Sequence, residues 1–396
     1  MGGFAKGKHW NYFLIIIALG LQLYSTHCAP GITYDSRQYL SSAQSFATNQ
    51  QLLNEEGKPH LAHTPLYAIT LSFLGKNRLQ LSKYVNTICL AITLLLWLYL
   101  GNQVLTRDVY QWLFAIVLAL ATPLQLVHHF VWSEPMFVML LSASVVLLYK
   151  YSKKNHPKYL LALALLGFFL CLQRNPGIFL VAGFALGLWW FLGVKWWKVF
   201  AYTLIATLGW LFWTFYTFTA NPKGTQPAFH NVLEELLSRH NLDHHLNVLS
   251  SWFLPISIPL MPRALLFSIL LIFVLVAVLY WQIKPGKFTK VLLTLVFVYI
   301  ICLQFTERVD YHETTRYLAV IFPLIFLALF QLLELINEHL PMIIARTFKL
   351  IVLLWLLYPI GRTWKNVGSW HKIRCATMTP NIQANYQNLI YLDSKK

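Results

Sequence analysis

Residues 80–101, QLSKYVNTICLAITLLLWLYLG, decide the fold class of this chain. The run is mostly apolar, and its only charged side chain is Lys83. A helix needs about 20 residues to cross the hydrocarbon core of a bilayer, so this run is long enough to span a membrane. Similar runs recur along the chain, and we predict about eleven spans, with a range of roughly ten to thirteen. They cover residues 12–28, 80–101, 112–127, 135–151, 159–173, 177–193, 197–219, 264–282, 291–305, 317–336 and 347–361.

The composition indicates the same class of protein. Hydrophobic residues make up 57% of the 396 residues and charged residues 11%, whereas a soluble protein carries about 25% charged residues. The apolar runs are continuous, whereas the strands of a membrane β-barrel alternate between apolar and polar residues. We therefore predict an all-α fold, a polytopic transmembrane helical bundle.

The distribution of charge predicts how the bundle is oriented, because Lys and Arg collect in the short cytoplasmic loops of membrane proteins. If Lys6 and Lys8 are cytoplasmic, the short inside loops are rich in Lys and Arg, and most acidic residues fall outside. This predicts a multi-pass protein of the plasma (bacterial inner) membrane with a cytoplasmic N-terminus. The net charge of +17 then reflects topology. The basic residues are scattered over short loops, so we predict no nucleic-acid partner.

Long segments lie only on the predicted outside, which is external or periplasmic. We predict one membrane domain, residues 1–361, with external loops 29–79 and 220–263, and a short external tail, 362–396. An apolar stripe in the first loop predicts a helix lying on the membrane surface and starting at Ser36. The second loop predicts another helix over residues 229–249.

The first span resembles a signal peptide, but we interpret it as an uncleaved anchor because further spans follow. The five cysteines do not indicate a disulfide framework. Cys28 and Cys375 could both face outside, but nothing in the sequence brings them together.

An aspartate follows the first span directly, in the run Tyr34-Asp35-Ser36-Arg37-Gln38-Tyr39. A carboxylate held at the membrane surface at the start of a long outside loop can take a proton from an acceptor hydroxyl or amine. Aspartate before serine is also a common helix N-cap. The position of Asp35 alone leaves both interpretations open.

Further charged side chains lie at the outside ends of the spans. Arg37 and His63 are candidate phosphate ligands or solvated loop cations. Glu134 is a candidate second acid in the cavity, or a helix N-terminal acid favoured by the helix dipole. Arg174 is either the partner of a cavity carboxylate or a turn cation. Arg316, which precedes Tyr317, is a lipid-phosphate ligand or an interface anchor.

The chain resembles the GT-C glycosyltransferases that use lipid-linked sugars in the order of its first features. These are the first span, Asp35 with Tyr39 four residues later, the run His63-Thr64-Pro65-Leu66-Tyr67, and the second span. The nearest branch is that of protein O-mannosyltransferases and aminoarabinose transferases. Arg316-Tyr317 followed by Pro323 is similar to a late motif of the same family. His63 and Thr64 depart from the pattern, because relatives often have Arg or Lys and a second Pro there.

The resemblance implies inverting transfer of a sugar from a polyprenyl-phosphate donor to a glycan, lipid or protein acceptor on the external face. It implies Asp35 as the general base, with Glu134 as a second catalytic acid. The substrate-binding residues that we predict on this basis are Arg37, Tyr39, His63, Tyr67, Arg174, Arg316 and Tyr317.

We predict no cofactor and no metal, because the histidine pairs lack a third ligand at a set spacing and the resembling branch works without metal. A transporter or flippase of lipid-linked sugars is an alternative, although the chain shows no repeat and no charge within the span interiors. An O-antigen polymerase or ligase is another, although key arginines in late loops would be expected there.

Overall fold

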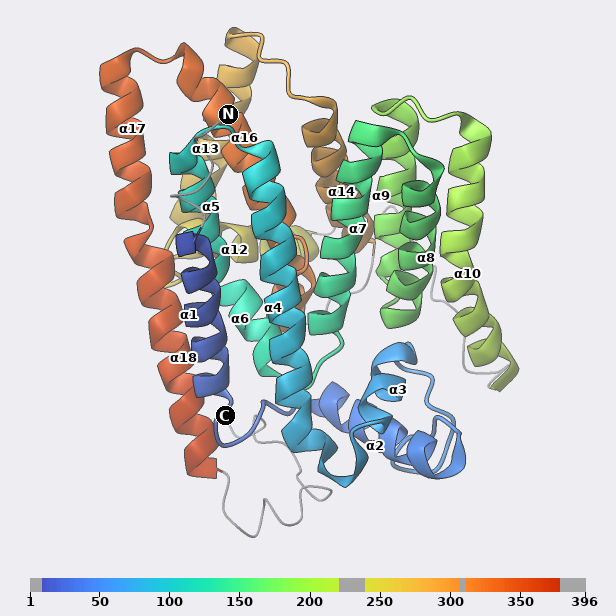
Figure 1. The fold of residues 1–396 in the computed structure, drawn as a ribbon. Helices are drawn as coiled ribbons and strands as arrows, with labels where there is room; N and C mark the ends of the chain where they lie inside the picture. The colour runs from blue at the N-terminus through green and yellow to red at the C-terminus, as the bar shows by residue number, and fades with distance from the viewer. Residues whose placement is uncertain (1–8, 221–238, 306–310, 378–396) are drawn as a thin grey trace.

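The computed structural model describes residues 9–220, 239–305 and 311–377 of the chain. Within these residues the fold is helical and forms a bundle of long helices, with two short helices across one end (Figure 1). The helices are α1 (His9–Ser25), α2 (Tyr34–Asn49), α3 (Leu66–Ser72), α4 (Arg78–Val104), α5 (Asp108–Ala119), α6 (Thr122–His129), α7 (Glu134–Lys154), α8 (Pro157–Gln173), α9 (Gly177–Trp190), α10 (Trp196–Ala220), α12 (Arg239–Phe253), α13 (Leu260–Tyr280), α14 (Lys287–Gln304), α15 (Tyr311–Ala319), α16 (Phe322–His339), α17 (Met342–Trp355) and α18 (Leu357–Thr377), with a 3₁₀ turn at Gly75–Asn77.

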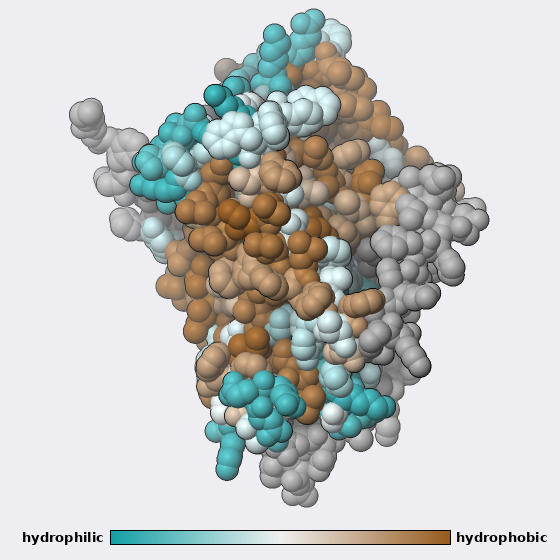
Figure 2. All heavy atoms as spheres, turned by 90° about the vertical axis from the view of Figure 1, so that its right-hand side faces the viewer, coloured by the Kyte–Doolittle hydropathy of each residue, from teal (hydrophilic) through white to brown (hydrophobic). Residues whose placement is uncertain are grey.

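The predicted membrane bundle is confirmed. In the part of the chain that the structure describes, eight helical segments are long and apolar enough to cross a membrane, and three shorter apolar helices accompany them. Together they coincide one for one with the apolar runs of the sequence. Figure 2 shows the side of the molecule that carries α10, where apolar side chains cover the middle and polar ones gather at the two ends. This is the surface of a helical bundle whose sides contact lipid.

Small residues let neighbouring helices of the bundle approach closely. α8 packs on α10, where a Cβ atom on Gly209 would collide with the Phe168 carbonyl group and one on Gly167 with Ala206. Such contacts are typical of membrane helices, which associate through close packing rather than through the hydrophobic effect. They hold α8 against α10, and Arg174 lies in the turn that follows α8.

The late spans differ from the prediction at their ends. The run expected at 317–336 is divided, because α15 ends at Ala319 and α16 starts at Phe322 with Pro323 in its first turn. The last apolar run is longer than expected, since α18 continues to Thr377 and the boundary predicted at residue 362 falls inside this helix. The segment was predicted to be an external tail because its composition is polar. Polar residues lie on the exposed side of α18, while Thr363 and Val367 are buried.

A disulfide joins Cys28, just after α1, to Cys375, near the end of α18. The two cysteines are 347 residues apart in the sequence. α1 and α18 lie side by side along one edge of the bundle (Figure 1). The pairing therefore follows from helix packing, which the sequence alone does not reveal.

The surface helix predicted in the first loop is α2, and it begins earlier than expected. Its N-cap is Thr33 rather than Asp35 or Ser36, because Thr33 and Ser36 form a capping box. The Ser36 hydroxyl accepts a hydrogen bond from the Thr33 backbone N–H at 3.0 Å. Asp35 is therefore released from capping and lies in the first turn of the helix.

The helix predicted in the second loop corresponds in part to α12. The beginning of the predicted segment lies outside the described residues. α12 itself extends to Phe253, beyond the predicted end at residue 249. Pro255 and Pro259 then separate it from α13, because proline disrupts a helix interior.

Candidate active site

A short backbone pairing brings the two candidate catalytic carboxylates together. The Gly31 N–H donates to the His129 carbonyl group, and the Val131 N–H donates to the Gly31 carbonyl group, both at 2.9 Å. Gly31 is required there because the ring of Phe130 fills the space that a Cβ atom would take. This pairing places the start of α2, with Asp35, beside the start of α7, with Glu134.

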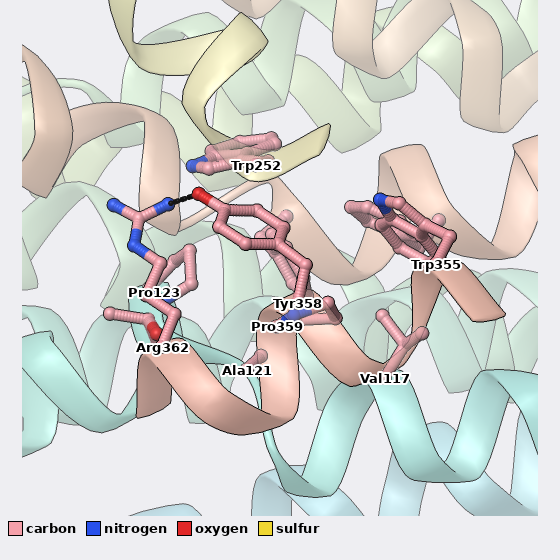
Figure 3. Close-up of a pocket in the computed structure, with 11 residues that line it drawn as sticks. Val117, Ala121, Pro123, Trp252, Trp355, Tyr358, Pro359 and Arg362 are labelled. Atoms are coloured by element: carbon pink, nitrogen blue, oxygen red, sulfur yellow. Dashed lines mark hydrogen bonds between the residues drawn. The ribbon is translucent and has the colours of Figure 1, made fainter. Parts of the chain in front are cut away.

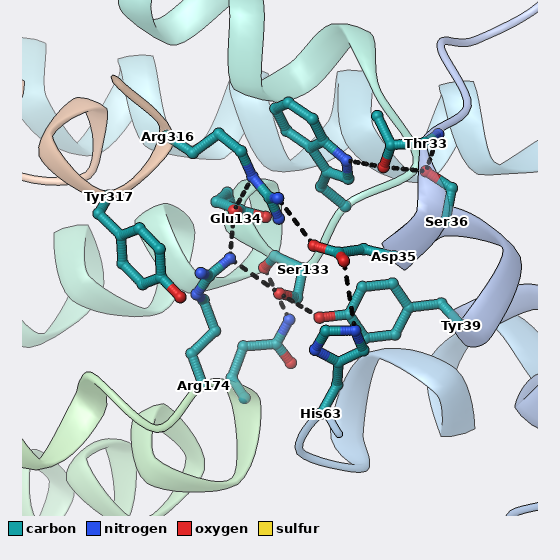
Figure 4. Close-up of polar contacts among 12 residues, drawn as sticks. Thr33, Asp35, Ser36, Tyr39, His63, Ser133, Glu134, Arg174, Arg316 and Tyr317 are labelled. Carbon is teal, nitrogen blue, oxygen red and sulfur yellow. Dashed lines mark hydrogen bonds and ion pairs between the residues drawn. The ribbon is translucent and has the colours of Figure 1, made fainter. Parts of the chain in front are cut away.

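Asp35 lies between the guanidinium group of Arg316 and the imidazole ring of His63 (Figure 4). Its Oδ2 atom forms an ion pair with Arg316 Nη1 at 2.7 Å, and its Oδ1 atom lies 3.5 Å from His63 Nε2. Burial by itself raises the pKa of Asp35, but the neighbouring His63 and Arg316 outweigh it and hold this pKa well below its usual range. Asp35 is therefore ionised, and with 21% of its side chain exposed it stays accessible.

Glu134 is fully buried, and its Oε1 atom holds two guanidinium groups. Arg316 Nε donates to this atom at 2.9 Å, and Arg174 Nη1 forms an ion pair with the same atom. Within the described residues the second oxygen, Oε2, has no hydrogen-bond partner. Arg316 therefore joins the two carboxylates into one network, with Asp35 at its more exposed side and Glu134 at its buried side.

Both arginines stay charged in this buried setting. Burial would lower the pKa of Arg316, but the carboxylates of Glu134 and Asp35 raise it above its usual value. The pKa of Arg174 is raised in the same way, against the effect of burial, chiefly by Glu134. The centre thus contains two carboxylates and two guanidinium groups, and their formal charges balance.

Ser133 connects this network to the aromatic side of the site. Its hydroxyl accepts hydrogen bonds from Tyr39 Oη at 2.9 Å and from Arg174 Nη1 at 3.1 Å. Gln173 Nε2 donates to the Ser133 carbonyl group at 2.8 Å. Burial raises the pKa of Tyr39, so its hydroxyl stays protonated and can donate this bond.

Aromatic rings position the cations from both sides. Arg316 lies over the ring of Trp132 at 4.0 Å, and Arg174 lies over that of Tyr317 at 4.8 Å, which are favourable cation–π arrangements. The indole N–H of Trp132 donates to Thr33 Oγ1 at 2.7 Å, which ties the ring to the N-cap of α2.

The remaining predicted residues lie at different distances from this centre. The ring of Tyr67 packs edge-on against that of Tyr39 at 5.1 Å, and its hydroxyl donates to Asn86 Oδ1 at 3.4 Å, so Tyr67 supports the site from behind. Arg37 Nε donates to Glu55 Oε1 at 2.7 Å. Residues two apart on a helix do not face each other, which is why Arg37 points away from the network that holds Asp35.

The structure therefore brings seven of the predicted residues together and leaves Arg37 and Tyr67 outside their polar contacts; the seven are Asp35, Tyr39, His63, Glu134, Arg174, Arg316 and Tyr317. Sequence reasoning missed Trp132, Ser133 and Gln173. The only signal for them was adjacency, because Ser133 precedes Glu134 and Gln173 precedes Arg174. Within the described residues no group of three or more His, Cys, Asp or Glu side chains is placed to hold a metal ion.

Comparison of the sequence with protein-family models and with curated proteins found no match. Solved structures do match. The structure of ArnT from Cupriavidus metallidurans bound to undecaprenyl phosphate has a TM-score of 0.54 at 13% identity, over 96% of this chain and 68% of ArnT. The structure of ArnT from the same organism in the apo state has a TM-score of 0.54 at 12% identity, over 96% of this chain and 68% of ArnT.

The arabinosyltransferase EmbB from Mycobacterium smegmatis gives a TM-score of 0.51 at 14% identity. The match covers 96% of this chain but 41% of EmbB. Identities this low establish shared architecture and leave the reaction open. The chain thus has the fold of the GT-C membrane glycosyltransferases.

Proposed function

We propose that this protein is a membrane glycosyltransferase that moves a sugar from a polyprenyl-phosphate donor to a glycan, lipid or protein acceptor. The observation that carries the proposal is the ionised Asp35, held by Arg316 and His63 beside a buried Glu134, in a GT-C fold. ArnT, which shares this fold, is seen with undecaprenyl phosphate bound. We propose that no metal or other cofactor takes part.

The proposed reaction exchanges one bond at the anomeric carbon for another. An acceptor O–H or N–H gives its proton to the Asp35 carboxylate while the acceptor atom attacks the anomeric carbon. The bond from that carbon to the phosphate oxygen breaks on the opposite face, and the polyprenyl phosphate leaves with the electron pair. Attack opposite the leaving group inverts the configuration of the anomeric carbon.

Arg316 supports both halves of this step. Its Nη1 atom neutralises Asp35 while the site is empty, which keeps that carboxylate weakly basic. A donor phosphate that engages Arg316 draws the cation away from Asp35, and the pKa of the aspartate then rises. The base therefore becomes stronger when the donor is bound, and the same guanidinium group stabilises the phosphate that leaves.

His63 and Glu134 hold the two partners in position. His63 Nε2 lies at Asp35 Oδ1, on the side away from Arg316, so it orients the carboxylate when Arg316 turns to the phosphate. Glu134 keeps Arg316 and Arg174 together despite their like charge. We therefore assign Glu134 to the organisation of the cations rather than to proton transfer, with Tyr39 and Tyr317 as walls of the substrate site.

We further propose that the site faces the external or periplasmic side of a plasma (bacterial inner) membrane, with a cytoplasmic N-terminus. The Cys28–Cys375 disulfide supports this side, because disulfides persist in oxidising compartments and Cys28 closely precedes Asp35 in the chain. Single cysteines introduced at Gln50 and at Asn155 test the orientation. An impermeant thiol reagent should label the first in intact cells and should label the second only after lysis.

Turnover of prenyl-phosphate sugars by the purified protein in nanodiscs tests the function. Each of a set of radiolabelled polyprenyl-phosphate pentoses and hexoses is incubated with the protein and with membrane extract as the acceptor source. We expect one donor to lose its label to an acceptor and to yield polyprenyl phosphate. If no donor is consumed by well-folded protein, the proposal fails.

A further inference from the structure

Two arginines outside the candidate active site lie against the same turn of α12. Arg263, in the first turn of α13, donates from Nε to Ser250 Oγ at 3.0 Å and from Nη2 to Asn247 Oδ1. Arg362, on α18, donates from Nη1 to the carbonyl group of Ser251. α13, the next helix along the chain, and α18, which is distant in sequence, thus bring two guanidinium groups to adjacent residues of α12.

The charges of these two arginines lack carboxylate partners. Within the described parts of the chain, neither Arg263 nor Arg362 takes part in an ion pair. Arg263 is only 2% exposed, and its Nη1 atom has no hydrogen-bond partner. The carbonyl end of α12 offers about half a negative charge, which leaves most of the positive charge unbalanced.

Unbalanced charge of this kind is unfavourable in an apolar setting and usually marks a site of function. Both arginines lie within helical segments that are apolar and long enough to span a membrane. A purely structural role as caps of α12 would account for the hydrogen bonds. It does not account for two cations without a counter-ion.

Arg362 also lines a crevice with an aromatic wall (Figure 3). Trp252, Trp355 and Tyr358 border it, and the Tyr358 hydroxyl accepts a hydrogen bond from Arg362 Nη1 at 3.2 Å. The crevice has room for about one water molecule, so an anion at Arg362 could place a single oxygen atom in it. The planar fork of arginine matches the oxygen atoms of a phosphate group.

We infer that Arg362, supported by Arg263, forms a second anion site that binds a phosphate group, apart from the centre around Asp35. Within the described residues, the hydrogen bonds of Arg263 and Arg362 go to α12 and to Tyr358, and none joins them to the network of Asp35, Arg316 and Glu134. The phosphate could belong to the headgroup of an isoprenoid lipid or be free phosphate. The inference concerns binding and does not depend on the proposed transfer reaction.

Equilibrium binding of radiolabelled farnesyl phosphate to the full-length protein in nanodiscs tests the inference. The first variant is Arg362→Gln, which removes the charge. The second is Arg362→Lys, which keeps the charge and serves if Arg362→Gln does not fold. Lys365→Gln is the matched control, because Lys365 is an exposed cation on the same helix. Competition with farnesol and with inorganic phosphate distinguishes the two sources of phosphate.

We expect Arg362→Gln to weaken binding by about tenfold or more, Arg362→Lys to weaken it less, and Lys365→Gln to leave it unchanged. Farnesol should not compete. Competition by inorganic phosphate as strong as that by farnesyl phosphate would assign the site to free phosphate. The inference would be overturned if folded Arg362→Gln or Arg362→Lys protein bound farnesyl phosphate like the wild type while Arg316→Gln protein lost this binding. Arg263 and Arg362 would then be caps of α12.

Discussion

Two groups of arginines in this membrane domain differ in what faces them. Arg174 and Arg316 share Glu134, and Arg316 also reaches Asp35, so their charges are matched within the protein. Arg263 and Arg362 face hydroxyl, amide and carbonyl groups of α12, which are neutral. A matched group responds when a ligand disturbs its ion pairs, whereas we infer that the unmatched group is completed by an anion.

The largest expected effect is on catalysis in the matched group. Asp35→Asn keeps the size of the side chain but cannot accept the acceptor proton. Because general base catalysis contributes about 10²- to 10⁴-fold, we expect kcat to fall by that factor in protein that still folds. Steady-state kinetics with the donor that the nanodisc assay selects measures it.

The matched control for Asp35→Asn is Asp108→Asn, since Asp108 is an exposed acid in the first turn of α5. This variant should keep wild-type kcat. Normal turnover by a folded Asp35→Asn protein would remove the base assignment, and Glu134 would then be the next candidate.

The next effect is on stability. Glu134→Gln leaves Arg174 and Arg316 buried beside each other without the anion that both contact. Breaking a buried ion pair on one side costs about 3 to 5 kcal/mol, so we expect the free energy of unfolding to fall by that order. Chemical denaturation in detergent measures the change.

Glu338→Gln is the control for Glu134→Gln, because Glu338 pairs with Arg107 at the surface, with 48% of its side chain exposed. Exposed pairs contribute about 0 to 1 kcal/mol. Equal losses in the two variants would contradict the view that the buried network is held together by Glu134.

A smaller effect should appear on acidification. The pKa of Asp35 is held below its unfolded value of about 3.9, so its stabilising contribution is complete above that pH and is lost as the pH falls toward the folded-state pKa. We expect wild-type protein to lose stability more steeply below about pH 4 than Asp35→Asn does. Thermal melts between pH 6 and pH 3 compare the two slopes, and parallel curves would show that the ion pair with Arg316 contributes nothing.

The smallest effect separates Arg37 from the matched group. Arg37 pairs with Glu55, and the two side chains are 25% and 37% exposed, so removing the charge should change stability by about 1 kcal/mol or less. We expect Arg37→Gln to leave the donor KM within about twofold of wild type. A large rise in the donor KM, with a normal acceptor KM, would return Arg37 to the phosphate site that the sequence first suggested.

The sequence by itself determined the membrane bundle, its apolar spans and the surface helix after the first span. It also pointed to Asp35, Glu134 and Arg316 one at a time, from their places at the ends of spans. These features depend on local composition and helical periodicity, which are visible in a short window of residues. The N-cap of α2 was misjudged because Asp35 before Ser36 is a common cap sequence, whereas Thr33 and Ser36 form the capping box.

Only the tertiary structure decided which of these residues meet. Arg316 and Glu134 are 182 residues apart, and Cys28 and Cys375 are 347 apart. The packing of α15 against α6, and of α18 against α1, sets these contacts, and no local pattern encodes them. Packing against α12 likewise brought Arg263 of α13 and Arg362 of α18 to one turn of that helix, because side-chain direction depends on the helix face that each neighbour covers.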